Sequence, residues 1–310
     1  MYKNNFVEEE IDAYIRQKRY RQINSVLVYQ NSQILAKRYY NGFDESSKNV
    51  INSVAKSIMS IATGIAVDKG WIQSIEEPIY SFLPQFGEGR DPLHRAITIR
   101  HLLSMTSGIF WNGGIHYHCP MMLQMRKSGD WISYIADCAV VDYPGTKYNY
   151  KEWDVILLAK VFDSVGIDLY ALIDRYLFNP LGIVSTQWYQ SPCGVYYSVG
   201  DGEENESRAM LTAIDMMKIG QVFLQGGIWD GQRIISESYI KEAVTPLKCN
   251  GGYGLLWWLG EDWHGCRGYG GQSITVIPDK NAVIVTQATP TSRGMGYFDV
   301  VDFCSSLLYH

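Results

Sequence analysis

Ser53 and Lys56 are the two side chains whose types and spacing most directly suggest chemistry. A serine hydroxyl is a weak nucleophile until a neighbouring base accepts its proton, and a lysine amine can be that base. Residues i and i+3 share one face of a helix, so this spacing would bring the Lys56 amine beside the Ser53 oxygen. The same residues also fit an N-cap serine followed by a solvated lysine in the first turn. The pattern alone leaves both interpretations open.

The residues after Ser53 predict a buried helix that would position this pair. Apolar side chains recur at spacings of four, three and four residues, which is the repeat of one helical face. They are Val54, Ile58, Ile61 and Ile65. The run Asp68-Lys69-Gly70 is typical of a helix end. Ser53 would then lie at the N-terminal end of the helix, where unpaired amides and the helix dipole favour developing negative charge.

Two later clusters also contain residues suited to catalysis. Residues 144–152 form a turn-rich run before an apolar helical stretch, with Tyr150 at the junction. Tyr150 could carry a proton if a neighbouring lysine lowered its pKa from about 10, or it could be an aromatic packing residue. Residues 266–272 are rich in glycine and precede a strand, so a substrate could approach the backbone closely there. A dinucleotide-binding loop is excluded at this position, because a strand follows it and not a helix.

Strand patterns gather near both ends of the chain, while helical patterns and loops dominate the middle. The strand segments are residues 25–29, 34–40, 254–259, 272–277 and 282–286. We therefore expect an α+β fold in which both ends of the chain build one antiparallel sheet flanked by helices. Residues 1–74 and 221–310 would form this discontinuous α/β sheet domain, and residues 75–220 a mostly helical lobe inserted in it. The active site would lie between these two parts.

Length and composition are those of an ordinary globular protein with one large domain or two modest ones. The chain has 310 residues, of which 46% are hydrophobic and 19% charged. The net charge is −5 and no long basic run occurs, so nucleic acid is not an expected partner. No apolar run could span a bilayer, and residues 1–10 lack the apolar core of a signal peptide. We expect a cytoplasmic protein, or a secreted one if a leader has been removed.

The cysteines do not form a pattern typical of disulfides or of metal sites. The six cysteines are widely spread and include no Cys-x-x-Cys pair, so we expect reduced thiols. The run His116-Tyr117-His118-Cys119 lacks a second ligand group at zinc-like spacing and is better explained as a loop. We therefore expect no metal and no cofactor.

Together, the three clusters resemble the motifs of the serine β-lactamase family in type and order. The resemblance is closest to the class C branch, with the related penicillin-binding proteins, esterases and 6-aminohexanoate-dimer hydrolases. The SxxK pair at Ser53, the Pro-Gly-Thr-Lys-x-x-Tyr run ending at Tyr150 and the glycine-rich start of a strand carry it. Residues 97–108 and 215–227 resemble linking segments of that family. The similarity extends from about residue 20 to residue 290 and implies a β-lactamase/transpeptidase-like fold.

The resemblance also implies a role for each matching residue. Ser53 would be the acylated nucleophile and Lys56 its proton acceptor. Tyr150 would relay a proton to the leaving group and help to activate the deacylating water. The backbone N–H groups of Ser53 and Tyr269 would form the oxyanion hole. The chain would thus be a serine hydrolase with three catalytic side chains.

The residues that would bind substrate depart from the pattern of the family. Glu152 replaces an asparagine whose amide donates to substrate, and an ion pair from Glu152 to Lys56 would hold that lysine protonated. Cys266-Arg267-Gly268 stands where the family has Lys- or His-Thr-Gly, whose cation helps to bind the β-lactam carboxylate. Arg267 could substitute for the cation, although strand alternation would point it to the opposite face. Both changes argue against efficient β-lactam hydrolysis.

We therefore expect a serine hydrolase that cleaves an ester or amide through a Ser53 acyl-enzyme. One alternative is a D-amino-acid peptidase or amidase, or a penicillin-binding protein. An alternative of another class is a non-catalytic ligand-binding protein on the same fold. The expected partner is a small ester, amide or peptide substrate. Some of the residues Trp111, Tyr117, His118, Trp257, Trp258 and His264 would line its cleft.

Overall fold

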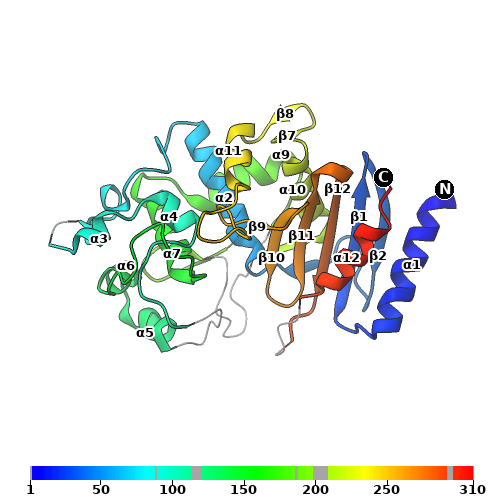
Figure 1. The fold of residues 1–310 in the computed structure, drawn as a ribbon, viewed down its shortest axis with the longest axis horizontal. Coiled ribbons are helices and arrows are strands. Elements are labelled where there is room, and N and C mark those ends of the chain that lie inside the picture. Colours follow the sequence, from blue (N-terminus) through cyan, green and yellow to red (C-terminus); the bar gives the residue numbers. More distant parts are fainter. Residues whose placement is uncertain are drawn as a thin grey trace.

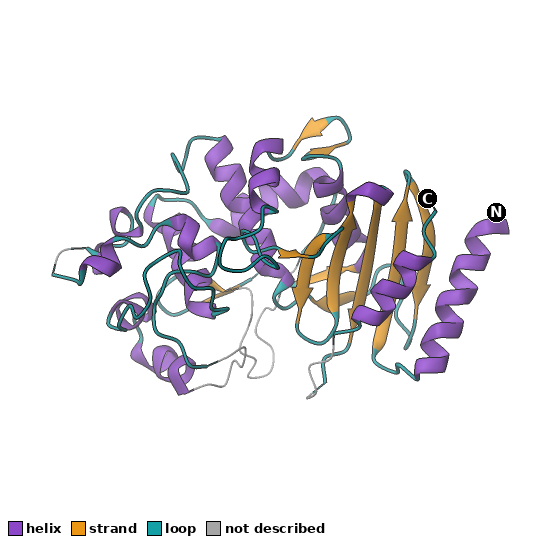
Figure 2. Cartoon of the chain, in the orientation of Figure 1, coloured by secondary structure: helices purple, strands orange, loops and turns teal. Residues whose placement is uncertain are grey.

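The computed structural model describes residues 2–87, 89–113, 120–185, 188–197, 209–291 and 296–309. One side of the molecule is a β-sheet with helices on both faces, and the other side is built mainly of helices and loops (Figure 1, Figure 2). The N- and C-terminal segments lie side by side at the sheet (Figure 1). The mixed α+β architecture is the one expected from the strand patterns at the two ends of the sequence.

The central sheet has six strands in the order β2-β1-β12-β11-β10-β9, and all neighbours are antiparallel. The strands are β1 (Ile23–Gln30), β2 (Gln33–Tyr39), β9 (Trp258–Leu259), β10 (His264–Gly268), β11 (Gln272–Ile277) and β12 (Ala282–Ala288). The first and last parts of the chain meet where β1 pairs with β12, with Val26 opposite Thr286. The β1–β2 hairpin turns at Asn31 and Ser32, both with positive φ, as a tight two-residue hairpin requires.

The two faces of the sheet pack against different helices, because side chains alternate along each strand. Val26 and Val28 belong to the core beneath α1 (Tyr2–Lys18) and α12 (Phe298–Ser306). Leu27 belongs to the larger core, which includes α2 (Val54–Asp68) and α10 (Ala213–Leu224). A Cβ at Gly220 of α10 would lie 2.6 Å from Val283 of β12, so only glycine lets this helix approach the sheet so closely.

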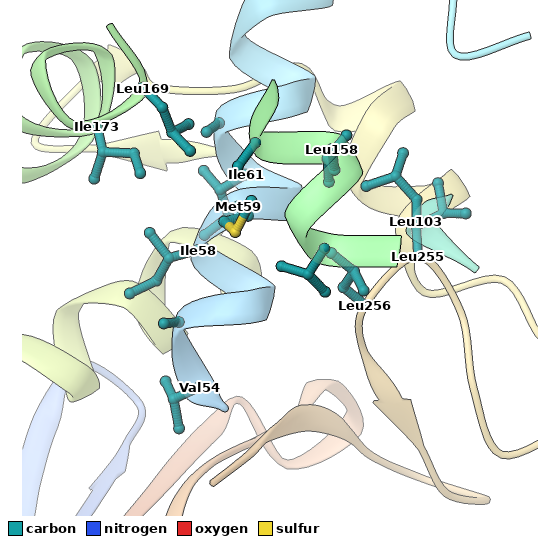
Figure 3. Packing of buried hydrophobic residues seen from close by; sticks show 14 of the residues in the cluster. Val54, Ile58, Met59, Ile61, Leu103, Leu158, Leu169, Ile173, Leu255 and Leu256 are labelled. Atoms are coloured by element: carbon teal, nitrogen blue, oxygen red, sulfur yellow. The ribbon is translucent and has the colours of Figure 1, made fainter. Parts of the chain in front are cut away.

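Helix α2 runs through the core, with thirteen of its fifteen residues buried. Its side chains pack against α4 (Ile99–Leu103), α7 (Glu152–Ser164), α8 (Leu169–Ile173) and the segment before β9 (Figure 3). Each fully buried isoleucine or leucine contributes on the order of 1.5–3 kcal/mol. The helix ends at Asp68, and Gly70 follows with a φ of 70°, so the predicted helix end is correct. The packing fixes the position of the helix and of the serine that precedes it.

The remaining elements are short. The helices are α3 (Pro92–Arg95), α5 (Pro120–Ser128), α6 (Trp131–Ala136), α9 (Asn179–Leu181) and α11 (Glu237–Ala243). The strand pairs are β3 (Lys48–Val50) with β6 (Met210–Thr212), β4 (Tyr189–Gln190) with β5 (Tyr196–Tyr197), and β7 (Ile228–Trp229) with β8 (Gln232–Arg233). The division into a sheet domain and an inserted lobe, with boundaries at residues 74 and 220, stays a prediction. Within the described ranges, no helix is both long and apolar enough to cross a membrane.

Candidate active site

Ser53 is the N-cap residue of α2, directly after a residue in the left-handed conformation. Asn52 has a φ of 49°, and its side-chain Nδ2 donates to the Tyr269 carbonyl at 2.8 Å. This bond ties the turn before α2 to the β10–β11 turn. A Cβ at Gly268 would lie 2.3 Å from the carbonyl oxygen of Ile51, so the approach of the two segments requires glycine there. The glycine-rich start of the strand thus lies against the turn that presents Ser53.

The Lys56 amine lies beside the Ser53 hydroxyl, as the i, i+3 spacing predicts. Lys56 Nζ donates to Ser53 Oγ at 3.0 Å and to Glu152 Oε1 at 2.7 Å. Lys56 is 1% exposed and Glu152 5% exposed, so this is a buried ion pair. Glu152 is the first residue of α7, where the helix dipole favours a carboxylate. The Lys56–Glu152 ion pair suggested by the sequence is therefore present.

Tyr150 completes the group around the serine. Its side chain lies close enough to Ser53 to interact with that hydroxyl, and its ring lies 5.3 Å from Lys56 Nζ. Burial raises the pKa of Tyr150 and the Glu152 carboxylate raises it further, while the interaction with Ser53 has a smaller opposite effect. The condition under which the sequence allowed Tyr150 to carry a proton, a pKa lowered by a neighbouring lysine, is not met, because desolvation of the phenolate raises the pKa. Tyr150 is a neutral phenol at physiological pH.

A second buried network fixes the segment that carries Tyr150 and Glu152. Lys151 Nζ donates to Ser107 Oγ at 3.0 Å and to the Ile109 carbonyl at 3.2 Å. Ser107 in turn donates to Asp154 Oδ1 at 2.6 Å, and burial raises the pKa of Asp154 to about 6. We did not predict this network from the sequence. Its signal is a lysine and an aspartate three residues apart, directly before the apolar run of residues 155–159.

The two side chains of the third cluster lie on opposite faces of β10. Cys266 is buried with its thiol near Ser57 of α2, and burial raises the thiol pKa to about 12. It presents no cation to the site. Arg267 points to the face that carries α12, as strand alternation predicts, and its Nη1 donates to Thr275 Oγ1 at 2.7 Å. Of this cluster, Gly268 and the Tyr269 backbone lie next to the turn before Ser53.

The aromatic and histidine residues that we expected to line the cleft do not all lie near Ser53. Trp257 is buried and stacks on Phe223 at 3.8 Å between ring centroids, with His264 against both rings. Trp111 is mostly buried against Trp153.

Trp258 is half-buried and stacks on Tyr150, with ring centroids 5.8 Å apart. Tyr117, His118 and the whole His116–Cys119 run lie outside the described residues. Within the described part of the chain, no group of three or more His, Cys, Asp or Glu side chains could hold a metal ion.

The sheet, the buried helix and the Ser53–Lys56–Tyr150 group define a serine β-lactamase/transpeptidase-like enzyme. The chain belongs to the beta-lactamase family, which it matches over residues 11–295. It is a serine hydrolase of that family, and the resemblance inferred from the three sequence clusters is confirmed.

The similar proteins include hydrolases and penicillin-binding proteins. The chain is 22% identical to the 6-aminohexanoate-dimer hydrolase of Paenarthrobacter ureafaciens, over 84% of this chain and 71% of that protein. It is 25% identical to penicillin-binding protein 4 of Amycolatopsis lactamdurans, over 70% of this chain and 64% of that protein.

Two solved structures illustrate the shared fold. EstCE1, described as a hydrolase with promiscuous acyltransferase activity, aligns over the full length of both chains with a TM-score of 0.77 at 15% identity. A penicillin-binding protein from Bacillus halodurans aligns over 96% of this chain and all of that chain, with a TM-score of 0.73 at 20% identity. The predicted β-lactamase/transpeptidase-like fold is therefore confirmed.

Proposed function

We propose that the protein hydrolyses an ester or amide bond of a small molecule through an acyl-enzyme on Ser53. The observation that carries this proposal is the contact of the Ser53 hydroxyl with both Lys56 and Tyr150. One neighbour is an amine that can accept the serine proton when it is neutral. The other is a phenol that can donate one. This pairing supplies both proton transfers that acyl transfer to a serine needs.

The reaction would proceed in two halves. Ser53 Oγ attacks the substrate carbonyl carbon while its proton passes to Lys56, and the carbonyl oxygen becomes an oxyanion. The backbone N–H groups of Ser53 and Tyr269 would bind that oxyanion, each contributing about 3–4 kcal/mol. The bond to the leaving alcohol or amine then breaks, and the leaving group takes the proton from Lys56 by way of Tyr150. A water molecule, deprotonated by the same groups, attacks the acyl-enzyme and releases the acid.

Glu152 affects this chemistry because its carboxylate is paired with Lys56. An ammonium group that is already paired with a carboxylate cannot accept a proton, so Lys56 must first release one. Oε2 of Glu152 is buried and has no hydrogen-bond partner among the described residues. Lys56 is therefore the group that balances this carboxylate charge. Transfer of a proton from Lys56 to Glu152 would remove two buried charges at once, which lowers the cost of preparing the neutral amine.

The residues around Ser53 also argue against efficient β-lactam hydrolysis. Glu152 offers an acceptor where the family has an amide donor, and its carboxylate is already bound to Lys56. Cys266 is buried against α2 and carries no positive charge toward Ser53. An ester or an unstrained amide without a carboxylate beside the reacting carbonyl fits these changes better.

Two other functions have specific observations in their favour. A D-amino-acid peptidase or penicillin-binding activity is supported by the similarity to penicillin-binding protein 4. A stable penicillin adduct on Ser53 would favour it. A non-catalytic ligand-binding role is supported by the Lys56–Glu152 ion pair, and ligand-induced stabilisation without product would favour that role.

The test is labelling with a fluorophosphonate probe and turnover of p-nitrophenyl acetate. We expect both in the wild-type protein and neither in Ser53→Ala. Ser60→Ala is the matched control, because Ser60 is also buried in α2 but lies against Tyr239. Equal labelling of wild type and Ser53→Ala would overturn the proposal.

A further inference from the structure

A cavity of about 670 Å³ lies on the sheet face opposite to α2. Its floor is formed by β10 and β11, one wall by α12, and the other by β9 and the turn that follows it. In Figure 1, α12 lies in front of the sheet near β12, and β11 and β10 lie to the left of this helix. The apolar lining residues are Trp258, Leu259, Trp263, Ile277, Phe298 and Val301. The volume and the apolar walls are those of sites that bind small molecules.

Arg267 is a cation in the lining of this cavity, and it forms no ion pair with the described residues. Its guanidinium lies 4.5 Å from the centre of the Trp263 ring and 5.3 Å from that of Phe298. Nη1 donates to Thr275, whereas Nε is buried and has no hydrogen-bond partner. Among the described residues, no carboxylate lies within ion-pair distance of Arg267. Burial lowers the pKa of Arg267 to about 10, as expected for a desolvated cation.

Two carboxylates also line the cavity, and they must be weighed against Arg267. Asp262 and Asp302 are both exposed, so water and salt screen their charges. The guanidinium lies between aromatic rings at the floor, where the effective dielectric constant is lower and a charge acts more strongly. A negatively charged group that reaches the floor therefore gains more from Arg267 than it loses to the two aspartates.

We propose that this cavity binds a small aromatic molecule that carries one carboxylate. The carboxylate pairs with the Arg267 guanidinium, and the aromatic body packs between Trp263, Phe298 and Trp258. This site is separate from Ser53 and does not depend on the proposed hydrolysis. The occupant touches Trp258, whose ring also packs against Tyr150 and Tyr253. Binding is therefore visible in tryptophan fluorescence.

The experiment compares two probes of the same shape, 2-naphthoate and the uncharged 2-naphthamide. Calorimetry on the full chain at low salt measures their dissociation constants. We expect 2-naphthoate to bind at least tenfold more tightly, and added salt to reduce the difference. Arg267→Gln should abolish or reverse this preference, because Asp262 and Asp302 remain in the lining, whereas Arg233→Gln, which changes an exposed arginine of β8, should alter neither affinity. Equal affinities in the wild type, or an unchanged preference in Arg267→Gln, would overturn the proposal.

Two further variants keep the proposal testable if Arg267→Gln fails to fold. Asp302→Asn removes an exposed negative charge and should strengthen 2-naphthoate binding two- to fivefold without changing 2-naphthamide. Phe298→Ala removes a ring that is 53% exposed and should weaken both probes about tenfold. Weaker naphthoate binding in Asp302→Asn would indicate a cation site and overturn the proposal. Absence of naphthoate binding together with self-association in sedimentation would show that a second copy covers this face, and would overturn it too.

Discussion

The Lys56 ammonium lies 2.7 Å from the Glu152 carboxylate and 3.0 Å from the Ser53 hydroxyl, in a place almost closed to solvent. Because Lys56 is paired with the Glu152 carboxylate, it is not free to accept the Ser53 proton. The two residues come from different helices, α2 and α7, and the Lys151–Ser107–Asp154 network fixes the second of them. In the proposed mechanism, the Lys56–Glu152 pair therefore determines how readily Ser53 can be deprotonated.

Glu152→Asn should raise the reactivity of Ser53 toward β-lactams. The substitution removes the carboxylate that holds Lys56 as an ammonium, and it restores an amide where the family has one. We expect acylation by penicillin or nitrocefin to become about ten times faster, measured by intact-protein mass spectrometry after quenching. Glu152→Gln should act in the same direction with a smaller effect. An unchanged rate in both variants would place Glu152 outside the reaction.

Tyr150→Phe should separate substrates by their leaving groups. Tyr150 is a neutral phenol, so the contribution that we propose for it is to donate a proton to the departing alcohol or amine. p-Nitrophenolate leaves without protonation, and its ester should lose less than tenfold in kcat/KM, which reports the acylation half of the reaction. An alkyl ester or an anilide should lose on the order of 100-fold or more. Equal losses for all substrates would show that Tyr150 acts otherwise.

The same raised pKa predicts the alkaline behaviour of the wild-type enzyme. A group whose pKa in the folded protein lies above its ordinary value of 10 stays protonated through the usual assay range. The rate for alkyl esters should therefore not decline through ionisation of Tyr150 up to about pH 10. A decline with an apparent pKa near 8 that is absent in Tyr150→Phe would contradict this assignment.

Gly268→Ala should separate β10 from the turn before Ser53. The new Cβ would lie 2.3 Å from the Ile51 carbonyl oxygen, so one of the two segments must move. We expect about 1–3 kcal/mol of lost stability and a fall in kcat of at least tenfold. Gly251→Ala is the matched control, because a Cβ there meets nothing within 4 Å. Thermal unfolding and esterase assays measure the two effects, and a fully active Gly268→Ala would show that this approach is not needed.

His264 should make the fold less stable in acid. Burial lowers its pKa from 6.5 to about 4, so the unfolded chain binds a proton there before the folded chain does. Stability from this residue is complete above about pH 6.5 and falls as the pH drops toward 4, by at most about 3 kcal/mol. His264→Phe should keep the packing against Trp257 and lose less stability between pH 7 and pH 4 in urea unfolding. Identical slopes for the two proteins would contradict the assignment.

The sequence predicted local features well and contacts between distant segments poorly. The repeat from Val54 to Ile65 defined α2 and its end, and alternation in β10 placed Arg267 on the face away from Cys266. These features follow from the periodicity of a single element. The bond from Asn52 to the Tyr269 carbonyl has no such periodic signal, because it joins segments more than 200 residues apart.

The environment of Tyr150 shows the same limit. Only the resemblance to a family placed Tyr150 near Ser53. The pKa of Tyr150 depends on its burial by distant segments, such as the one that contains Tyr253 and Trp258. The sequence shows a lysine that could lower the pKa of Tyr150, but it does not show the burial that raises this pKa. Similarly, Trp257 and His264 looked like candidates for the cleft but pack against Phe223 in the core.

The most direct test is to identify the residue that becomes acylated during turnover. The protein is mixed with p-nitrophenyl acetate, quenched in acid within milliseconds, digested and analysed by mass spectrometry. We predict one acetylated peptide that contains Ser53, formed together with a burst of p-nitrophenolate and absent in Ser53→Ala. An acetyl group on another residue, or turnover without a burst that persists in Ser53→Ala, would contradict this prediction.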